Sequence, residues 1–468
     1  MVWKLADFGG ATALVAENGG EISYSLLKDY TEKLAERIPP RKLVFSLCSN
    51  TVGSLVGYVA FLNAGVVPLM LSSDMDSALF ARLSEIYKPD YLWMPAESAA
   101  RLKISMPEKY SAHGYILLKT PYDSEYPLDG DLALLLSTSG STGDPKLVRQ
   151  SFKNILSNTN SIVEYLKIDS SERAVTTLPM NYTYGISIIN THFAAGASLA
   201  LTDRTLMQRE FWDFLKASGA TSFGGVPYTY EMLERLRFQR MQLPLLRTLT
   251  QAGGKLSLEL HKKFAQWAVD SKKKFVVMYG QTEATARMAY LPPEKSVEKC
   301  GSMGIAIPGG KFRLFGEDGL EIMTPDTAGE LVYEGANVAM GYAVCGEDLS
   351  RGDEWRGRLA TGDIAKFDSD GYFYVVGRKK RFLKIFGNRV NLDEMERILR
   401  LEFPEIELAC AGADDKMKIY IVSPAAAAEV AAFAAAKTGF NKSAFETVAV
   451  ASIPKNAAGK ILYGELSK

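Results

Sequence analysis

The feature that most constrains the fold is an alternation of short apolar runs with amphipathic stretches, which continues to about residue 380. The apolar runs have the length of buried strands and lie at residues 43–48, 133–138, 174–179, 197–202, 274–280 and 329–335. Stretches with a helical period, such as residues 75–87 and 208–219, lie between several of them. Strands that alternate with helices are typical of α/β proteins with layered, largely parallel sheets.

The longest apolar stretch, residues 55–72, is predicted to fold as a helix and a strand rather than to span a membrane. Two glycines, an asparagine and a proline interrupt it, and no basic residues flank it. A membrane-spanning helix needs about 20 consecutive apolar residues. We expect a helix that ends near Asn63, a turn at Ala64 and Gly65, and then a short buried strand.

The balance of charged residues argues against several classes of partner. The 468 residues include 54 Lys plus Arg and 54 Asp plus Glu, so the formal net charge is zero. A neutral chain does not attract nucleic acid or an anionic membrane through a global field. The three histidines (His113, His192 and His261) are too few for a multi-His metal site. The four cysteines are scattered and the N-terminus lacks a signal pattern, so a reduced, cytoplasmic protein is expected.

The pattern changes after about residue 371, where a smaller domain is predicted. Residues 371–387 are typical of two strands around a basic turn, and residues 391–401 of a helix capped by Asn391. A strand at 418–423 and an alanine-rich helix at 425–437 follow. We therefore expect a large N-terminal domain (1–379) and a small α+β C-terminal domain (380–468). The basic run at 378–381 is interpreted as a solvated turn and hinge, with a nucleic-acid patch as the alternative.

A loop rich in glycine and hydroxyl groups follows the apolar run that begins at Leu132. Its sequence, STSGSTGDPK, spans residues 137–146 and ends in Lys146. Exposed backbone N–H groups after a strand form an anion-binding concavity, glycine permits close approach, and lysine adds a point charge suited to phosphate. The loop therefore predicts phosphate binding. It lacks the Gly-Lys-Ser/Thr ending of a Walker A loop, and no GxGxxG indicates a dinucleotide fold.

Three further motifs place polar residues next to predicted strands or turns. The run at 274–280 ends in YGQTE, which offers an aromatic face at Tyr279 and a carboxylate at Glu283 for Mg²⁺. Asp363 lies in a TGD sequence, interpreted as a glycine turn whose carboxylate either binds a ribose diol or only forms the turn. Lys460 ends a PKNAAGK sequence close to the C-terminus; a lone lysine there is usually a solvated charge.

Taken together, these motifs resemble the adenylate-forming superfamily of acyl-CoA synthetases, aryl-CoA ligases, nonribosomal peptide adenylation domains and luciferases. The resemblance extends from about Tyr24 to Leu466 and rests on five motifs in the expected order: STSGSTGDPK, YGQTE, TGD, GRKKRFLKIFGNRV and PKNAAGK. It implies a large αβαβα-type N-terminal domain that binds ATP and the carboxylate, and a small mobile domain that carries the catalytic lysine.

The resemblance also implies a role for each matching residue. Those expected to bind the nucleotide are Thr138, Ser139, Gly140, Ser141, Thr142, Gly143 and Lys146 at the triphosphate, Gly253, Gly254, Tyr279 and Gly280 around the adenine with Gln281 in the same motif, and Asp363 and Arg378 at the ribose. Thr282 is expected at the α-phosphate, Glu283 at Mg²⁺, Lys380 at the hinge and Lys460 as the catalytic lysine.

The reaction implied by the resemblance begins with a carboxylate and Mg·ATP, which give an acyl-AMP and pyrophosphate. In a second step the acyl group passes to a thiol. CoA is the favoured acceptor, and the phosphopantetheine of a carrier protein is the alternative. A catalytically idle nucleotide-binding scaffold is the competing interpretation from another class, and a kinase or ATPase is disfavoured by the missing Walker ending.

The predicted acyl pocket is where this sequence departs from its relatives. Phe152 stands where many members carry a histidine, and Tyr182 stands at an aromatic or histidine gate. Asn181 replaces the acidic residue that amino-acid-activating relatives usually have nearby, which weighs against an α-amino acid. The predicted pocket residues are Tyr182, Tyr184, Gly225, Val226, Gln251 and Arg287. The two tyrosines are alternatively plain core aromatics, and Arg287 either binds a second acid group or forms a structural ion pair.

Overall fold

The computed structural model describes residues 3–137, 146–386, 388–455, 459 and 461–466. The chain forms two compact units. The first contains the residues up to 311 together with 334–359, and the second contains 312–333 and the residues from 360 onward. The predicted domain boundary between residues 379 and 380 falls inside the second unit, at the start of the short helix η6 (Lys379–Arg381). The position of the hinge stays a prediction.

Two sheets form the framework of the first unit. The nine-stranded sheet has the order β16 (Ile305–Ala306), β15 (Ala289–Tyr290), β14 (Lys274–Tyr279), β13 (Thr248–Gln251), β12 (Ser222–Gly225), β10 (Arg173–Val175), β11 (Ser198–Ala200), β1 (Thr12–Val15) and β2 (Glu21–Ser23). The eight-stranded sheet has the order β19 (Gly341–Ala343), β9 (Leu147–Ser151), β8 (Leu132–Ser137), β4 (Val67–Ser72), β3 (Leu43–Cys48), β5 (Tyr91–Pro95), β7 (Tyr115–Lys119) and β6 (Glu108–Ala112).

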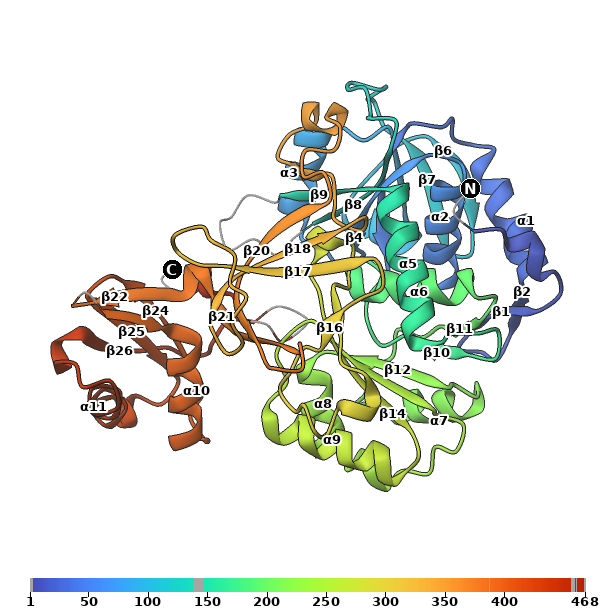
Figure 1. Cartoon of the computed structure of the whole chain (residues 1–468). Helices are drawn as coiled ribbons and strands as arrows, with labels where there is room; N and C mark the ends of the chain where they lie inside the picture. The colour runs from blue at the N-terminus through green and yellow to red at the C-terminus, as the bar shows by residue number, and fades with distance from the viewer. Residues whose placement is uncertain (1–2, 138–145, 387, 456–458, 460, 467–468) are drawn as a thin grey trace. The chain divides into compact units, whose positions relative to one another are not determined.

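Helices cover both faces of each sheet, which gives the five-layered αβαβα arrangement that the sequence predicted (Figure 1). The helices between the sheets, which share one apolar core with both inner faces, are α1 (Tyr24–Ala35), α2 (Val52–Asn63), α5 (Phe152–Leu166) and α6 (Thr183–Ala194). The outer layers are α3 (Ser77–Tyr87) and α4 (Ala96–Arg101) on the eight-stranded sheet, and α7 (Arg209–Ala217), α8 (Pro227–Arg235) and α9 (Leu258–Asp270) on the nine-stranded sheet.

Strand β3 shows why the apolar runs are continuous rather than alternating. Its residue Val44 belongs to the core between the sheets, whereas Phe45 packs with α3 on the other face. A parallel strand that is covered on both sides buries every side chain. Helix α2 ends at Asn63, Gly65 adopts a left-handed φ of 70°, and β4 follows, as predicted. In the described ranges, no helix has both the length and the apolar character to cross a membrane.

The second unit holds smaller sheets and two longer helices. Its strands are β17 (Gly310–Phe315), β18 (Gly329–Gly335), β20 (Arg358–Phe367) and β21 (Phe373–Arg378) in one sheet, β22 (Phe382–Ile385) and β23 (Asn388–Asn391) in a second, and β24 (Leu408–Ala413), β25 (Lys416–Ile421) and β26 (Phe445–Ala449) in a third. Helices α10 (Leu392–Glu402) and α11 (Ala427–Thr438) share a core with the third sheet. Asn391 caps α10 as predicted, because its side chain accepts N–H bonds from Asp393 and Glu394.

The basic run at 378–381 does not close a hairpin. Its flanking strands β21 and β22 lie in different sheets, so the run connects two sheets rather than two paired strands. The three cations of the run whose side chains the structure describes pair with carboxylates within the unit. Arg378 meets Asp363, Lys379 meets Glu330, and the buried Arg381 meets Asp393 and Glu396. The positive charge of the run therefore serves the fold of this unit.

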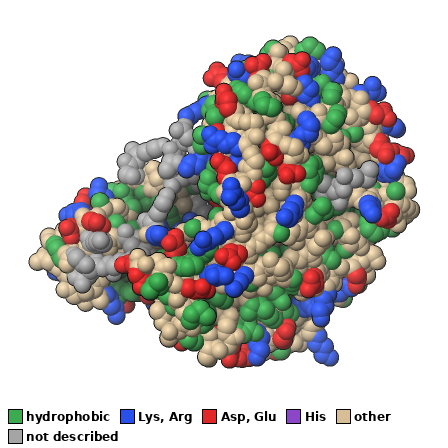
Figure 2. All heavy atoms as spheres, turned by 45° about the horizontal axis from the view of Figure 1, so that its top comes forward, with side chains coloured by type: hydrophobic (Ala, Val, Ile, Leu, Met, Phe, Trp, Pro, Cys, Tyr) green, Lys and Arg blue, Asp and Glu red, His purple; other side chains and the backbone are tan. Residues whose placement is uncertain are grey.

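Charged side chains of both signs are interspersed over the face seen in Figure 2. This distribution agrees with the formal net charge of zero. All four cysteines are free thiols, and Cys48 and Cys410 are buried.

Candidate functional site

The carboxyl ends of three neighbouring parallel strands bring predicted site residues to one edge of the nine-stranded sheet. Gly225 ends β12 and pairs in register with Gln251, which ends β13. Tyr279 ends the next strand, β14. Ligands of open α/β sheets bind in the crevice outside the carboxyl ends of the strands. Segments predicted separately from the sequence therefore meet where such a crevice is expected.

The start of helix α6 packs against these strand ends. The Tyr184 hydroxyl lies 2.7 Å from Thr250 Oγ1, and the Tyr184 side chain is buried. Tyr182 is half-buried. A Cβ added at Gly253 would lie 2.5 Å from the Tyr182 hydroxyl oxygen, so the hydroxyl packs against Gly253. Burial raises the pKa of Tyr182 to about 12, so its phenol is neutral near pH 7. Tyr184 is thus fixed beside Thr250, whereas Tyr182 reaches the loop predicted for adenine.

Gln251 and Val226 shape that loop. Gln251 Nε2 donates to the carbonyl oxygens of Ala252 (3.2 Å) and Gly254 (2.9 Å). Val226 caps α8, and its Cγ1 would lie 3.0 Å from a Cβ on Gly253. Gly253 itself has a φ of 82°, in the left-handed region that favours glycine. Close packing on both sides therefore leaves no room for a side chain at Gly253.

The turn after β14 requires glycine at residue 280 because the backbone of Ala286 packs directly against it. A Cβ on Gly280 would lie 1.6 Å from the carbonyl oxygen of Ala286. The turn passes through the short helix η3 (Thr282–Ala284), and Ala286 then adopts a φ of 119°, which is strained for a residue with a side chain. The glycine expected to admit a ligand is thus needed by the turn that displays Glu283. Its place beside the adenine stays a prediction.

One phenol connects two predicted phosphate-site residues. The Tyr342 hydroxyl donates to Glu283 Oε1 at 2.7 Å, and Lys146 Nζ lies 5.5 Å from the centroid of the Tyr342 ring. Burial and the nearby Glu283 carboxylate raise the pKa of Tyr342, which keeps its proton on the phenol. Gln150 Nε2 donates to the Thr282 carbonyl oxygen at 3.0 Å. The sequence did not identify Tyr342, because no motif surrounds it.

Arg287 is buried, with 2% of its surface exposed. Its guanidinium carbon lies 4.0 Å from the centroid of the Tyr184 ring, and Nη2 donates to Ser187 Oγ at 2.9 Å. Nη1 contacts Met278 Sδ, whereas the buried Nε has no hydrogen-bond partner in the described chain. Among the described residues, no Asp or Glu lies within ion-pair distance of Arg287. The structural ion pair considered from the sequence is therefore not found there.

Asp363 and Arg378, both predicted at the ribose, are partners in the second unit. Asp363 lies inside strand β20 and pairs in register with Arg378 on β21. Arg378 Nε lies 3.2 Å from Asp363 Oδ1, and Asp363 is 3% exposed. The sequence placed Asp363 in a turn, and this is wrong. Gly362 adopts a left-handed φ of 72° without ending the strand, since β20 continues to Phe367 and its ladder to β21 begins at Asp363.

Several predicted residues lie outside the described part of the chain. They are Thr138, Ser139, Gly140, Ser141, Thr142, Gly143 and Lys460, together with the side chain of Lys380. The described ends of both segments are paired. Ser137 and Leu147 are register partners in an antiparallel ladder, and a bridge joins Lys455 to Ile461. The roles assigned to these residues stay predictions.

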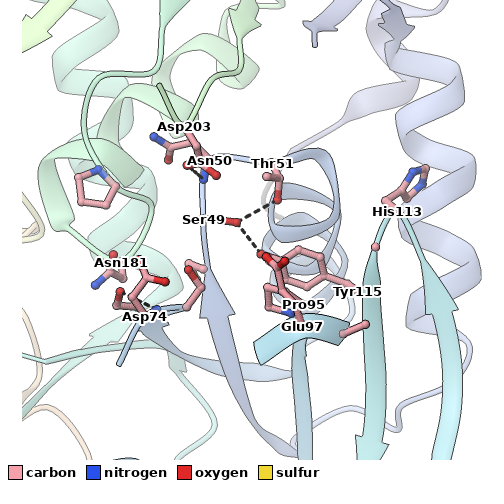
Figure 3. Close-up of a pocket in the computed structure, with 16 residues that line it drawn as sticks. Ser49, Asn50, Thr51, Asp74, Pro95, Glu97, His113, Tyr115, Asn181 and Asp203 are labelled. Carbon is pink, nitrogen blue, oxygen red and sulfur yellow. Dashed lines mark hydrogen bonds between the residues drawn. The ribbon is translucent and has the colours of Figure 1, made fainter. Parts of the chain in front are cut away.

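A separate polar cavity of about 700 Å³ lies at the carboxyl ends of β3, β4 and β5. Figure 3 shows Ser49 between Thr51 and Tyr115, to which it is hydrogen-bonded at 3.2 and 3.0 Å. Asp203 accepts the backbone N–H bond of Asn50, and burial raises the pKa of its carboxyl. Asn181, which directly precedes the predicted gate tyrosine, lines this cavity, whereas none of the described residues predicted to contact the nucleotide or the acyl group does so.

Comparison with known proteins places the arrangement in a family. A family model described as AMP-binding enzyme matches residues 2–343. The chain is 27% identical to an oxalate–CoA ligase of Arabidopsis thaliana over 86% of this chain and 83% of that protein. It is 29% identical to a 2-succinylbenzoate–CoA ligase of Bacillus licheniformis over 72% of this chain and 70% of that protein.

The fold is also shared with solved structures. One is the O-succinylbenzoate–coenzyme A synthetase of Bacillus subtilis in complex with ATP and magnesium ion. Its TM-score is 0.78 at 21% identity, covering 99% of this chain and 98% of that one. The family model covers well over half of this chain. The chain therefore belongs to the AMP-binding enzyme family, within the adenylate-forming superfamily of acyl-CoA ligases.

Proposed function

We propose that this protein is an AMP-forming acid–thiol ligase, which activates a carboxylic acid with Mg·ATP and transfers the acyl group to CoA. The observation that carries the proposal is the connection of Glu283 and Lys146 through Tyr342, at the strand end that also presents Tyr279. A carboxylate, a cation and an aromatic face are the groups that a magnesium–nucleotide complex requires. The relatives named as CoA ligases support CoA as the acceptor.

The donor set around Glu283 fits magnesium. Glu283 is half-buried, and the hydrogen bond from Tyr342 engages its Oε1 atom. In the described ranges no cluster of three Asp, Glu, His or Cys residues gathers into a metal site. Mg²⁺ usually takes one or two carboxylates and completes its shell with phosphate oxygens and water. Bound at Glu283, the ion would offset negative charge on the phosphates.

The chain's own residues must overcome repulsion between two anions, the carboxylate and the triphosphate. Lys146 would bind phosphate oxygens as a point charge, and Thr282 would donate its hydroxyl to the α-phosphate. Lys460 would follow the charge that develops on the bridging oxygen, which is the kind of electrostatic stabilisation that contributes most to catalysis. Asp363 would accept from the ribose hydroxyls, with its carboxylate oriented by Arg378 at 3.2 Å.

Product analysis tests the proposal. The purified protein is incubated with Mg·ATP, CoA and a panel of carboxylic acids, and the nucleotide products are separated. Release of AMP and pyrophosphate with one acid, and of acyl-CoA when CoA is present, is the expected result. ADP and phosphate would indicate phosphoryl transfer, and no turnover with any acid would indicate an idle scaffold. Replacement of CoA by a phosphopantetheine-bearing carrier protein tests the alternative acceptor.

A matched pair of variants links the products to the site. Glu283→Gln removes the proposed magnesium ligand with little change in size, and the expected loss is about 10²–10³-fold in rate. Glu97→Gln is the control, because Glu97 lines the separate cavity in Figure 3. Equal activity of the two variants would contradict the placement of magnesium at Glu283.

A further inference from the structure

A positive charge is buried in the predicted acyl pocket without an acidic partner. Arg287 is 2% exposed and touches the Tyr184 ring, the Ser187 hydroxyl and the Met278 sulfur. We propose that the carboxylic substrate carries a second anionic group, in the simplest case a second carboxylate, and that Arg287 binds this group. The inference rests on the proposed function, because it assigns the substrate class of the same site.

The chemistry of arginine makes this burial informative. A guanidinium stays protonated in proteins, so it does not escape the cost of burial by losing its proton. Buried charges are normally paired with an opposite charge. Around Arg287 the described contacts are all neutral, and its Nε is a buried donor with no partner in that part of the chain. An anion supplied by the substrate would satisfy both the charge and the donor.

The nearby phenols do not supply the missing charge. Tyr165 contributes a hydroxyl that donates to Met278 Sδ at 3.1 Å. Burial raises the pKa of Tyr165 to about 12 despite the positive charge of Arg287, so it is neutral near pH 7. Burial also raises the pKa of Tyr184, although Arg287 opposes the rise. The electrostatic need of Arg287 is therefore unmet by the described protein.

The position of Arg287 matches the far end of an acyl substrate. Tyr184 contacts Arg287 through its ring and Thr250 on β13 through its hydroxyl. Arg287 therefore lies on the same side of the predicted acyl pocket as the strand ends. Between Glu283 and Arg287 the strained Ala286 turns the chain. Glu283 contacts Tyr342, whereas Arg287 contacts Tyr184, so the two charged side chains lie on different sides of the predicted site. A substrate that reacts near Glu283 and ends near Arg287 needs an anion at each end.

Activity with matched acids tests the inference. Acid-dependent ATP–pyrophosphate exchange is measured for malonate, succinate, glutarate, adipate and terephthalate, each paired with the monoacid of the same carbon skeleton and with its monomethyl ester. We expect one diacid to exceed its monoacid and ester by about 10²–10⁴-fold in kcat/KM, because a site built for a polar group rejects analogues that lack it. Comparable activity of the monoacids would overturn the inference.

Variants separate anion binding from a structural role. Arg287→Gln is expected to raise KM for the diacid and to abolish the preference over the monoacid, because uniform binding is lost. Arg287→Lys is expected to retain part of the preference. Arg247→Gln is the control, since Arg247 lies on the same unit and pairs with Glu172. If Arg287→Gln lowers kcat/KM equally for the diacid and the monoacid, Arg287 either binds the reacting carboxylate or only stabilises the fold. The inference then fails.

A binding readout keeps this test independent of catalysis. The melting temperature is recorded with each diacid and monoacid in the absence of ATP. We expect a diacid to raise the melting temperature of the wild type and to leave that of Arg287→Gln unchanged. Absence of a diacid-specific rise would overturn the inference. A diacid-specific rise without AMP or pyrophosphate from any acid would support the anion site and contradict the proposed function instead.

Discussion

The phenol of Tyr342 donates a 2.7 Å hydrogen bond to Glu283, and the ammonium of Lys146 lies over the same ring. The three residues come from β19, from the turn after β14 and from the end of the predicted phosphate loop. Tyr342 thus contacts both a carboxylate and a cation of the predicted phosphate site. Preorganised charge of this kind costs no rearrangement during the reaction.

Tyr342→Phe isolates the role of the hydroxyl. The ring beneath Lys146 is retained, but Glu283 loses the bond that orients it. Hydrogen bonds to charged groups are worth about 1.5–3 kcal/mol, which corresponds to a loss of roughly 10–100-fold in kcat/KM for Mg·ATP. The measurement is pyrophosphate exchange at varied magnesium concentration. Tyr58→Phe is the control, because its hydroxyl bonds to Asn190 in the core, and equal loss in both variants would contradict a role at the site.

Much of the first unit could be predicted because local sequence and burial agree there. The runs at 43–48 and 274–280 form β3 and β14, since strands covered on both faces must be apolar throughout. The turn at Ala64 and Gly65 was also predictable, because Gly65 supplies the left-handed φ that ends α2.

Long-range pairing explains what the sequence could not predict. The TGD sequence suggests a turn locally, yet Asp363 extends a strand because β21 pairs with it. The strands β21 and β22 were recognised, but their separation into two sheets depends on partners elsewhere in the chain. Tyr342 and Glu283 are 59 residues apart, and no local pattern links them.

Arg287→Met is expected to stabilise the ligand-free protein. The variant replaces a buried, unpaired charge by an apolar chain of similar length among Tyr184 and Met278. Exchanging buried charges for apolar residues often stabilises by about 1–4 kcal/mol. Urea unfolding without substrate measures the change. A clear loss of stability would show that the contacts of Arg287 with Tyr184, Ser187 and Met278 stabilise the fold by more than the burial of its charge costs.

Arg381→Met provides the contrasting case. Arg381 is buried in the second unit, with Asp393 at 2.7 Å and Glu396 at 2.6 Å. Removing one partner of a buried pair leaves an uncompensated charge, and the usual loss is about 3–5 kcal/mol. We expect this unit to unfold at a lower urea concentration in the variant than in the wild type, as measured by hydrogen exchange of β24 and β25. Unchanged protection of these strands would contradict the assigned pairing.

Gly280→Ala tests the turn that displays Glu283. The added methyl group would lie 1.6 Å from the Ala286 carbonyl oxygen, so the backbone must shift. We expect a destabilisation of about 1–3 kcal/mol, typical of strain at a special backbone site, and a large loss of pyrophosphate exchange. Gly130→Ala is the control, since nothing lies within 4 Å of its added Cβ. Normal activity of Gly280→Ala would show that the turn tolerates the shift.

The buried histidines predict acid sensitivity. Burial lowers the pKa of His192 and of His261 from 6.5 to about 4, so both are neutral in the folded protein near pH 7. Between these values the unfolded chain binds protons that the folded chain does not, and stability therefore falls as pH falls from about 6.5 to 4. Each histidine accounts for roughly 3 kcal/mol at the acid end. Urea unfolding at pH 7 and pH 4.5 checks this, and His192→Gln is expected to reduce the difference.

Acid-dependent ATP–pyrophosphate exchange, measured in the wild type and in Lys460→Ala, decides whether this protein forms an acyl adenylate. We expect the wild type to exchange label only when a suitable acid is present and to form AMP as its nucleotide product. We expect Lys460→Ala to be slower by about 10²–10³-fold, because one well-placed charge is lost. Exchange near the wild-type rate in Lys460→Ala, or ADP as the product, would contradict this expectation.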